Sequence, residues 1–114
     1  MWRVILGDAA AGEVEEIHRW YESCRQGLGD EFLRDFDRAE LRLSLHPSSG
    51  TFLGRKTRSA QLSRFPYVLL YVLEADQVVV TAVLHSHRHP RRRSERVQER
   101  SVSGYLAPEP FVAA

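Results

Sequence analysis

Apolar residues recur at intervals of three and four along two successive stretches of the N-terminal half. A short apolar segment, Arg3–Leu6, comes before them and is predicted to be a strand. The first stretch spans residues 8–26, and its apolar stripe is Val14, Ile17, Tyr21 and Cys24. The second spans residues 30–46, with a stripe of Phe32, Phe36, Ala39 and Leu43. This spacing places side chains on one face of a helix, so we predict a strand followed by two helices.

Polar residues and glycines mark the ends of both predicted helices. Asp8 and Asp30 stand where an N-cap is expected, because a short carboxylate accepts hydrogen bonds from unpaired backbone N–H groups. Gly27-Leu28-Gly29 separates the helices, and glycine readily adopts the left-handed conformation that ends a helix. Pro-Ser-Ser-Gly at residues 47–50 ends the second helix. The short Gly27-Leu28-Gly29 connection between the two helices predicts an antiparallel helical hairpin.

Beyond residue 50 the periodicity changes to two. Residues 52–62 are polar and basic around a predicted short strand, and residues 64–73 and 77–85 predict two longer strands joined by a turn. The second long strand is apolar on both faces, so we expect it to be the central strand, covered on both sides. Alternation along the first long strand places one set of side chains in the core, namely Phe65, Tyr67, Leu69 and Tyr71.

These elements are most simply combined in an α+β fold. An N-terminal strand, an antiparallel helical hairpin and a three-stranded antiparallel meander would form one sheet with the helices on a face. A chain of 114 residues is long enough for one such domain. We assign the domain to residues 1–93 and a C-terminal tail, a short helix followed by flexible chain, to residues 94–114.

Charge is distributed unevenly along the chain. The formal net charge is +1, but the balance is −4 over residues 1–50 and +5 over residues 51–114. This asymmetry indicates a surface for a polyanion or an acidic partner, although uneven solubilising charge explains it equally well. The candidate target-binding or phosphate-binding residues are Arg55, Lys56, Arg58, Arg91 and Arg92.

The sequence also restricts the compartment. No apolar run approaches the roughly 18 residues that cross a membrane, and the N-terminus becomes polar too early for a signal peptide. Cys24 is the only cysteine, which excludes an internal disulfide and fits a reducing compartment. We therefore expect a cytoplasmic protein without membrane contacts, in which Cys24 has a buried or half-buried structural role.

Three stretches in a fixed order carry a family resemblance. Residues 13–22 (EVEEIHRWYE) precede Gly27-Leu28-Gly29 with Phe32, and residues 64–67 (RFPY) open a strand. Strand residues 78–83 then run into residues 85–90 (HSHRHP). This set resembles the RelE/ParE superfamily, the toxins of bacterial type II toxin–antitoxin systems, also known as plasmid stabilisation proteins. The ending is closer to the ParE-like branch, although His89 stands where that branch usually has aspartate.

The resemblance implies a growth-inhibiting toxin that a cognate antitoxin neutralises. ParE-like members bind DNA gyrase and trap its cleaved-DNA state without chemistry of their own, and we favour this function. The antitoxin is expected in the groove beside the helical hairpin and along the basic edge at residues 52–64. Operator DNA would be contacted only through the antitoxin.

RelE-like members are instead ribosome-dependent mRNA endoribonucleases, in which a 2′-hydroxyl attacks the adjacent phosphate without a metal. For this alternative the candidate catalytic residues are His85, Arg64, Arg88 and Tyr71. Structural roles compete with catalytic ones, because Tyr67 and Tyr71 share the predicted core face and His85 stands at a corner. A non-toxic, binding-only member of the same fold is a further alternative.

No cofactor is expected. His85, His87 and His89 are close enough in sequence to hold zinc, but no Cys, Asp or Glu nearby supplies a fourth ligand. The sequence also contains no phosphate-cradling glycine loop or nucleophile motif, which disfavours a small-molecule enzyme.

Overall fold

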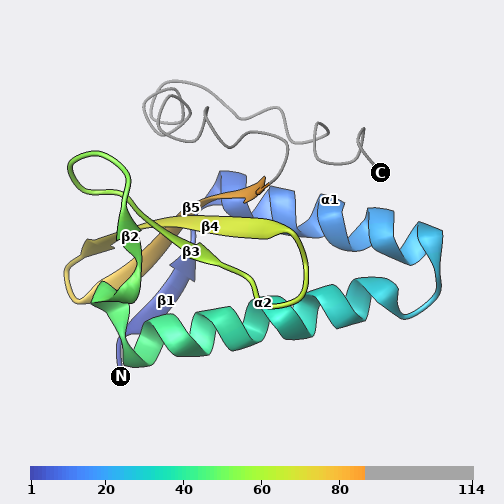
Figure 1. The fold of residues 1–114 in the computed structure, drawn as a ribbon, viewed down its shortest axis with the longest axis horizontal. Helices are drawn as coiled ribbons and strands as arrows, with labels where there is room; N and C mark the ends of the chain where they lie inside the picture. Colours follow the sequence, from blue (N-terminus) through green and yellow to red (C-terminus); the bar gives the residue numbers. More distant parts are fainter. Residues whose placement is uncertain (87–114) are drawn as a thin grey trace.

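Two helices cover one face of a five-stranded sheet in the computed structural model, which describes residues 1–86 (Figure 1). The sheet order is β1-β5-β4-β3-β2; β1 is parallel to β5 and the other pairs are antiparallel. This is the expected α+β fold, with β2 as an additional edge strand. The elements are β1 (Arg3–Leu6), α1 (Asp8–Cys24), α2 (Leu28–Leu45), the 3-10 helix η1 (Pro47–Ser49), β2 (Thr51–Phe52), β3 (Arg58–Gln61), β4 (Tyr67–Glu74) and β5 (Gln77–His85).

The expected boundary at residue 93 and the tail at residues 94–114 lie outside the described residues. Neither described helix is both long and apolar enough to cross a membrane.

The helix ends differ from the predicted caps. Gly7 is the N-cap of α1, because its carbonyl accepts the first helical hydrogen bond, from the N–H of Ala11 at 2.9 Å, while its own N–H still donates to the Val80 carbonyl at 2.9 Å. Gly27, with φ 88°, is the N-cap of α2, so Asp30 lies within the first turn. The prediction that Asp8 and Asp30 are N-caps is therefore wrong.

The expectation for Cys24 is also wrong. Cys24 is exposed, because the last turn of α1 projects past the strands that its earlier turns cover (Figure 1). A helical stripe buries side chains only as far as a neighbouring element extends, and the sheet ends before this turn.

A β-bulge interrupts the simple alternation of side chains along β5. Leu70 pairs with Ala82 and Tyr71 pairs with Val80, which leaves Thr81 as an extra residue in β5. The extra residue reverses the alternation, so Val80 and Val83 both belong to the core under the helices. β5 lies between β1 and β4, whereas the middle position belongs to β4, because β3 and β2 continue the sheet beyond it.

The main core lies between the helices and the sheet. It contains both predicted helical stripes up to Ile17 and Leu43, together with the predicted β4 face, where Tyr67, Leu69 and Tyr71 are 0–1% exposed. Burial of each large apolar side chain contributes about 1.5–3 kcal/mol, so this face accounts for much of the stability. The prediction that Tyr67 and Tyr71 pack in the core is confirmed.

α1 also completes the hydrogen bonding of β5. The pairing of β1 with β5 ends at Leu6 and Val80, so β5 continues beyond its parallel neighbour. There the N–H of Val83 donates to Oε1 of Glu13 at 2.8 Å, and Glu13 is 3% exposed. A buried N–H without an acceptor would cost about 1–3 kcal/mol, which this carboxylate avoids.

Candidate functional site

Arg55 and Lys56 lie at the tip of the loop between β2 and β3. The loop is closed by the N–H of Leu53, which donates to the Thr57 carbonyl at 2.7 Å, and Gly54 provides the left-handed backbone with φ 91°. Both basic side chains are exposed, and within residues 1–86 neither takes part in a hydrogen bond or an ion pair. This loop therefore presents two cations to a partner.

Arg58, the third basic residue of this segment, is engaged in the fold. Its guanidinium lies 3.9 Å from the centroid of the Phe52 ring, a cation–π contact. Its Nη1 donates to the carbonyls of Ser48 and Gly50 at 3.0 and 3.3 Å. Arg58 therefore holds the turn before β2 against β3.

Tyr71 anchors the same turn from the core. Its hydroxyl donates to the Pro47 carbonyl at 2.8 Å and accepts a hydrogen bond from the Gly50 N–H at 2.9 Å. The side chain is fully buried. A role as proton donor in catalysis would require this hydroxyl to leave both partners.

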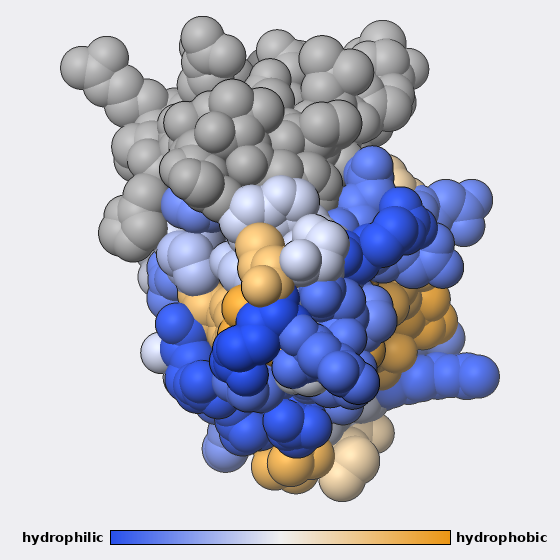
Figure 2. Space-filling model, turned by 90° about the vertical axis from the view of Figure 1, so that its right-hand side faces the viewer, coloured by the Kyte–Doolittle hydropathy of each residue, from blue (hydrophilic) through white to orange (hydrophobic). Residues whose placement is uncertain are grey.

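Arg64 lies at the other end of β4, in the connection from β3. Its Nη2 donates to Oε1 of Glu31 at 3.1 Å, and Arg25 contacts the other oxygen of Glu31 at 3.2 Å. Hydrogen bonds from Arg25 and then Arg64 hold the pKa of Glu31 below its usual value. Hydrophilic residues predominate at this end of the molecule (Figure 2).

Asp35 fixes the backbone of this connection. Its Oδ2 accepts hydrogen bonds from the N–H groups of Arg64 and Phe65 at 2.8 and 2.9 Å, and its side chain is 0% exposed. Burial alone would raise the pKa of Asp35. These backbone N–H groups and the charge of Arg38 outweigh that effect and hold the pKa below the usual value.

His85 ends β5 directly opposite Tyr67. The two rings meet edge to face, with centroids 5.2 Å apart, and His85 is half-buried. Burial raises the pKa of Tyr21, whose hydroxyl forms a hydrogen bond with Tyr67 that partly opposes this effect. His85 therefore lies beside an aromatic cluster, which also includes Phe32 and Phe65.

Among residues 1–86, the predicted site residues lie at different places along β4. His85 lies opposite Tyr67, whereas Tyr71 is four residues further along β4, about 13 Å away along the strand. Arg58 pairs with Tyr71 at this second end of the strand. Five of the residues singled out in the sequence lie outside the described residues, namely His87, Arg88, His89, Arg91 and Arg92.

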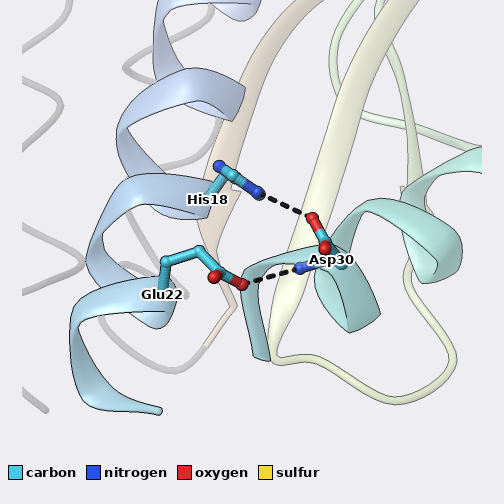
Figure 3. Close-up of side chains that lie close together, drawn as sticks. All are labelled: His18, Glu22 and Asp30. Atoms are coloured by element: carbon cyan, nitrogen blue, oxygen red, sulfur yellow. Dashed lines mark hydrogen bonds and ion pairs between the residues drawn. The ribbon is translucent and has the colours of Figure 1, made fainter. Parts of the chain in front are cut away.

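A cluster of His18, Glu22 and Asp30 was missed by the sequence reasoning (Figure 3). Ligand atoms of the three residues lie within 4.8 Å of one another, which is close enough for a metal ion. However, Glu22 accepts hydrogen bonds from the N–H groups of Gly27, Gly29 and Asp30 at 3.2, 2.7 and 3.2 Å. Nε2 of His18 lies 3.1 Å from Oδ1 of Asp30. The cluster is thus accounted for as a cap of α2 provided by α1.

This cap explains the Gly27-Leu28-Gly29 motif. Gly27 adopts the left-handed backbone, and Gly29 brings the helix N-terminus against α1. A Cβ at Gly29 would lie 2.5 Å from the His18 carbonyl oxygen and 2.7 Å from Cγ of Glu22. In the sequence, the signal for this cap is Glu22, which stands five residues before Gly27, the first of the two glycines.

A groove of about 220 Å³ lies between the two helices. Val14 and Leu33 provide apolar walls, and the charged or polar lining residues are Glu15, His18 and Arg19. The groove suits an apolar side chain of a partner segment that also carries charge.

A family model described as the ParE toxin of the type II toxin–antitoxin system, parDE, matches residues 4–90. The matched segment contains all described helices, the complete strands β2 to β5 and β1 from its second residue. No curated protein matches the chain.

Proposed function

This chain belongs to the ParE toxin family of type II toxin–antitoxin systems, and we propose that it inhibits bacterial growth by acting on DNA gyrase. The observation that carries this proposal is that two of the four residues proposed for RNA cleavage, Tyr71 and Arg64, are engaged in the fold. The Tyr71 hydroxyl is buried between Pro47 and Gly50, and Arg64 is paired with Glu31. A toxin that acts by binding does not need these groups as an acid or a phosphate clamp.

Such a toxin needs an accessible binding surface. Arg55 and Lys56 fit this requirement, since both are exposed and neither has a side-chain partner within residues 1–86. Their positive charge suits a target that holds DNA, because cations near a polyanion accelerate and strengthen association.

The proposed antitoxin contacts the groove between the helices as well as the same basic loop. An apolar side chain of its folded segment would enter the groove between Val14 and Leu33, and acidic residues would approach Arg55 and Lys56. Neutralisation would then follow from occupation of the basic loop. Contact with operator DNA would be made by the antitoxin.

Induction of the toxin in a bacterium, with and without co-expression of the small protein encoded beside it as the candidate antitoxin, tests the proposal. We expect growth arrest with intact transcripts, and relief when the neighbour is co-expressed. Transcripts cut during translation would instead support an endoribonuclease and direct mutagenesis to His85, Arg64 and Arg88. Absence of arrest at good expression would support a non-toxic, binding-only member.

A matched pair of variants sharpens this test. Arg55→Ser with Lys56→Ser removes the unpaired cations of the loop and is expected to weaken growth arrest. Arg3→Ser with Arg34→Ser also removes two exposed cations, on β1 and α2, and is expected to leave the arrest unchanged. Equal toxicity of the two variants would contradict the assignment of the loop to target binding.

A further inference from the structure

Phe52, the last residue of β2, is exposed at the edge of the sheet. It is 53% exposed, whereas every other Phe, Tyr and Trp within residues 1–86 is buried or half-buried. β2 is the edge strand, and the loop that carries Arg55 and Lys56 follows it directly (Figure 1). An aromatic ring in this position adds little to the core and is available to a partner.

Arg58 holds the ring of Phe52 in place. The two residues are paired across β2 and β3, and the guanidinium lies 3.9 Å from the ring centroid. The same guanidinium is anchored by the carbonyls of Ser48 and Gly50. Because Arg58 covers one face of the ring, the exposure comes mainly from the opposite face and the ring edge. The ring is therefore a pre-positioned platform, which lowers the entropy cost of stacking a flat group on it.

The segment around this platform carries no negative charge. Residues 41–73 contain no Asp or Glu and five basic residues, namely Arg42, Arg55, Lys56, Arg58 and Arg64. Arg55 and Lys56 follow Phe52 by three and four residues, so at most roughly 14 Å of chain separates the ring from either cation. A strand of about four stacked nucleotides, at roughly 3.4 Å each, spans the same distance.

We propose that the Phe52 platform and the basic loop form a binding site for single-stranded DNA. A base would stack on Phe52, and the flanking phosphates would lie at Arg55 and Lys56. Aromatic rings beside cations bind unpaired strands in this way without reading their sequence. Duplex DNA fits the platform less well, because both faces of each internal base are already covered by neighbouring bases.

This inference rests on the proposed function for its setting. DNA cleaved by gyrase has strand ends, where a base has an open face. The toxin would then contact the DNA of the complex directly, and an acidic antitoxin segment at the same loop would compete with that contact. The binding itself is a property of the toxin alone and is measured without gyrase.

Fluorescence anisotropy of a labelled oligothymidine about twelve nucleotides long, titrated with the purified full chain, tests the inference. Phe52→Ala should weaken binding roughly five- to 150-fold, because base stacking is lost, and Phe52→Tyr should retain the affinity of the parent. The matched control is Leu45→Ala, which truncates another exposed apolar residue, 52% exposed, and should bind like the parent. Circular dichroism establishes that each variant is folded.

The salt dependence of binding separates stacking from charge. Arg55→Ser with Lys56→Ser should reduce the slope of log affinity against log salt concentration by roughly 1.4, because each phosphate contact on a single strand contributes about 0.7. Phe52→Ala should lower the affinity and leave this slope unchanged. A reduced slope in Phe52→Ala would show that the ring acts through its charged neighbours and would contradict stacking.

Three further results would overturn the inference. They are no binding of oligothymidine by the folded chain, equal affinities of Phe52→Ala and Leu45→Ala, and tighter binding of a duplex of the same length. Tighter binding of oligouridine would identify RNA as the ligand and would equally overturn it.

The proposed function fails separately from this inference. A toxin that binds oligothymidine but leaves supercoiling by gyrase unchanged would contradict only the action on gyrase. Inhibition of gyrase by a toxin that does not bind oligothymidine would contradict only the DNA-binding site.

Discussion

Two basic regions of the molecule use their charge differently. Near Arg64, cations are paired: Arg64 and Arg25 share Glu31, and Arg38 lies 3.5 Å from Asp35. At the loop between β2 and β3, Arg55 and Lys56 are exposed, and within residues 1–86 they have no side-chain partner. The first region joins both helices to the β3–β4 connection, whereas the second contributes nothing comparable to the fold.

This difference shows that the contribution of charged side chains to the stability of the fold depends on their burial and geometry more than on their number. Exposed ion pairs such as Arg64–Glu31 contribute little, because solvent and salt screen the charges. The buried carboxylate of Asp35, which accepts two backbone hydrogen bonds, contributes more, because its removal leaves two N–H groups without an acceptor. The unpaired loop is free to evolve for binding, because its charges do not hold the structure.

The largest expected effect is on the paired region. Asp35→Ala should lower the free energy of unfolding by about 3 kcal/mol, because the buried N–H groups of Arg64 and Phe65 lose their acceptor. Asp37→Ala, at an exposed position of the same helix, should change it by less than about 0.5 kcal/mol. Urea unfolding followed by circular dichroism measures both, and similar values for the two variants would refute the role of Asp35.

The same carboxylate predicts a pH dependence. The folded-state pKa of Asp35 is depressed, so its stabilisation is present above the unfolded pKa of about 3.9 and is lost as pH falls through the folded pKa. The difference in stability between the parent and Asp35→Asn should therefore shrink below about pH 4. The control is Glu31→Gln, whose exposed ion pairs should give a smaller pH dependence. A difference that stays constant down to acid pH would argue against this account.

The cap of α2 gives the next largest effect. Gly29→Ala should destabilise the protein by about 2 kcal/mol, because the added methyl meets the His18 carbonyl and the Glu22 side chain. Gly12→Ala, in the middle of α1 where a Cβ meets nothing within 4 Å, should stabilise it by about 0.5–1 kcal/mol. Thermal unfolding should show a lower melting temperature than the parent for Gly29→Ala and a higher one for Gly12→Ala. Shifts in the same direction would contradict the close approach of Gly29 to α1.

Tyr71→Phe should cost about 1–2 kcal/mol, because the core keeps its ring but the Pro47 carbonyl and the Gly50 N–H lose their partner. Ser48→Ala, in the same turn, should have almost no effect, since Arg58 uses the carbonyl of Ser48 and not its hydroxyl. Denaturant midpoints separate the two, and a neutral Tyr71→Phe variant would show that the hydroxyl does not hold the turn.

The smallest effect on stability is expected at the unpaired loop. Arg55→Ser with Lys56→Ser should change the free energy of unfolding by less than about 0.5 kcal/mol. The same variant should bind the antitoxin more weakly and with a shallower dependence on salt, because two exposed charges are lost. Calorimetric titration at two salt concentrations tests this. Unchanged affinity would show that the antitoxin does not bind at this loop.

Apolar periodicity predicted the order of the elements because it reports burial directly. The stripes through Ile17 and Phe36 and the alternation through Tyr67 and Tyr71 all point into the core. The cap of α2 was mispredicted because the side chain that accepts its first N–H groups is Glu22 on the neighbouring helix, and not the local residue Asp30. Local sequence rules do not contain such a contact.

The candidate site was less predictable for the same reason. Arg58 and Arg55 look alike in the sequence, but within residues 1–86 the fold brings the carbonyls of Ser48 and Gly50 to Arg58 and none to Arg55. Asp35 interrupts the apolar stripe of α2, which signals a buried polar role, yet its backbone partners lie 29 and 30 residues later. Pairing across such distances becomes visible only in the folded chain.

Supercoiling of relaxed plasmid by purified gyrase is the most direct test of the proposed action of this toxin. The account predicts that the purified toxin inhibits supercoiling and leads to accumulation of cleaved plasmid, that antitoxin added first prevents this, and that Arg55→Ser with Lys56→Ser weakens it. Supercoiling that proceeds unchanged in a molar excess of folded, growth-arresting toxin would contradict the account.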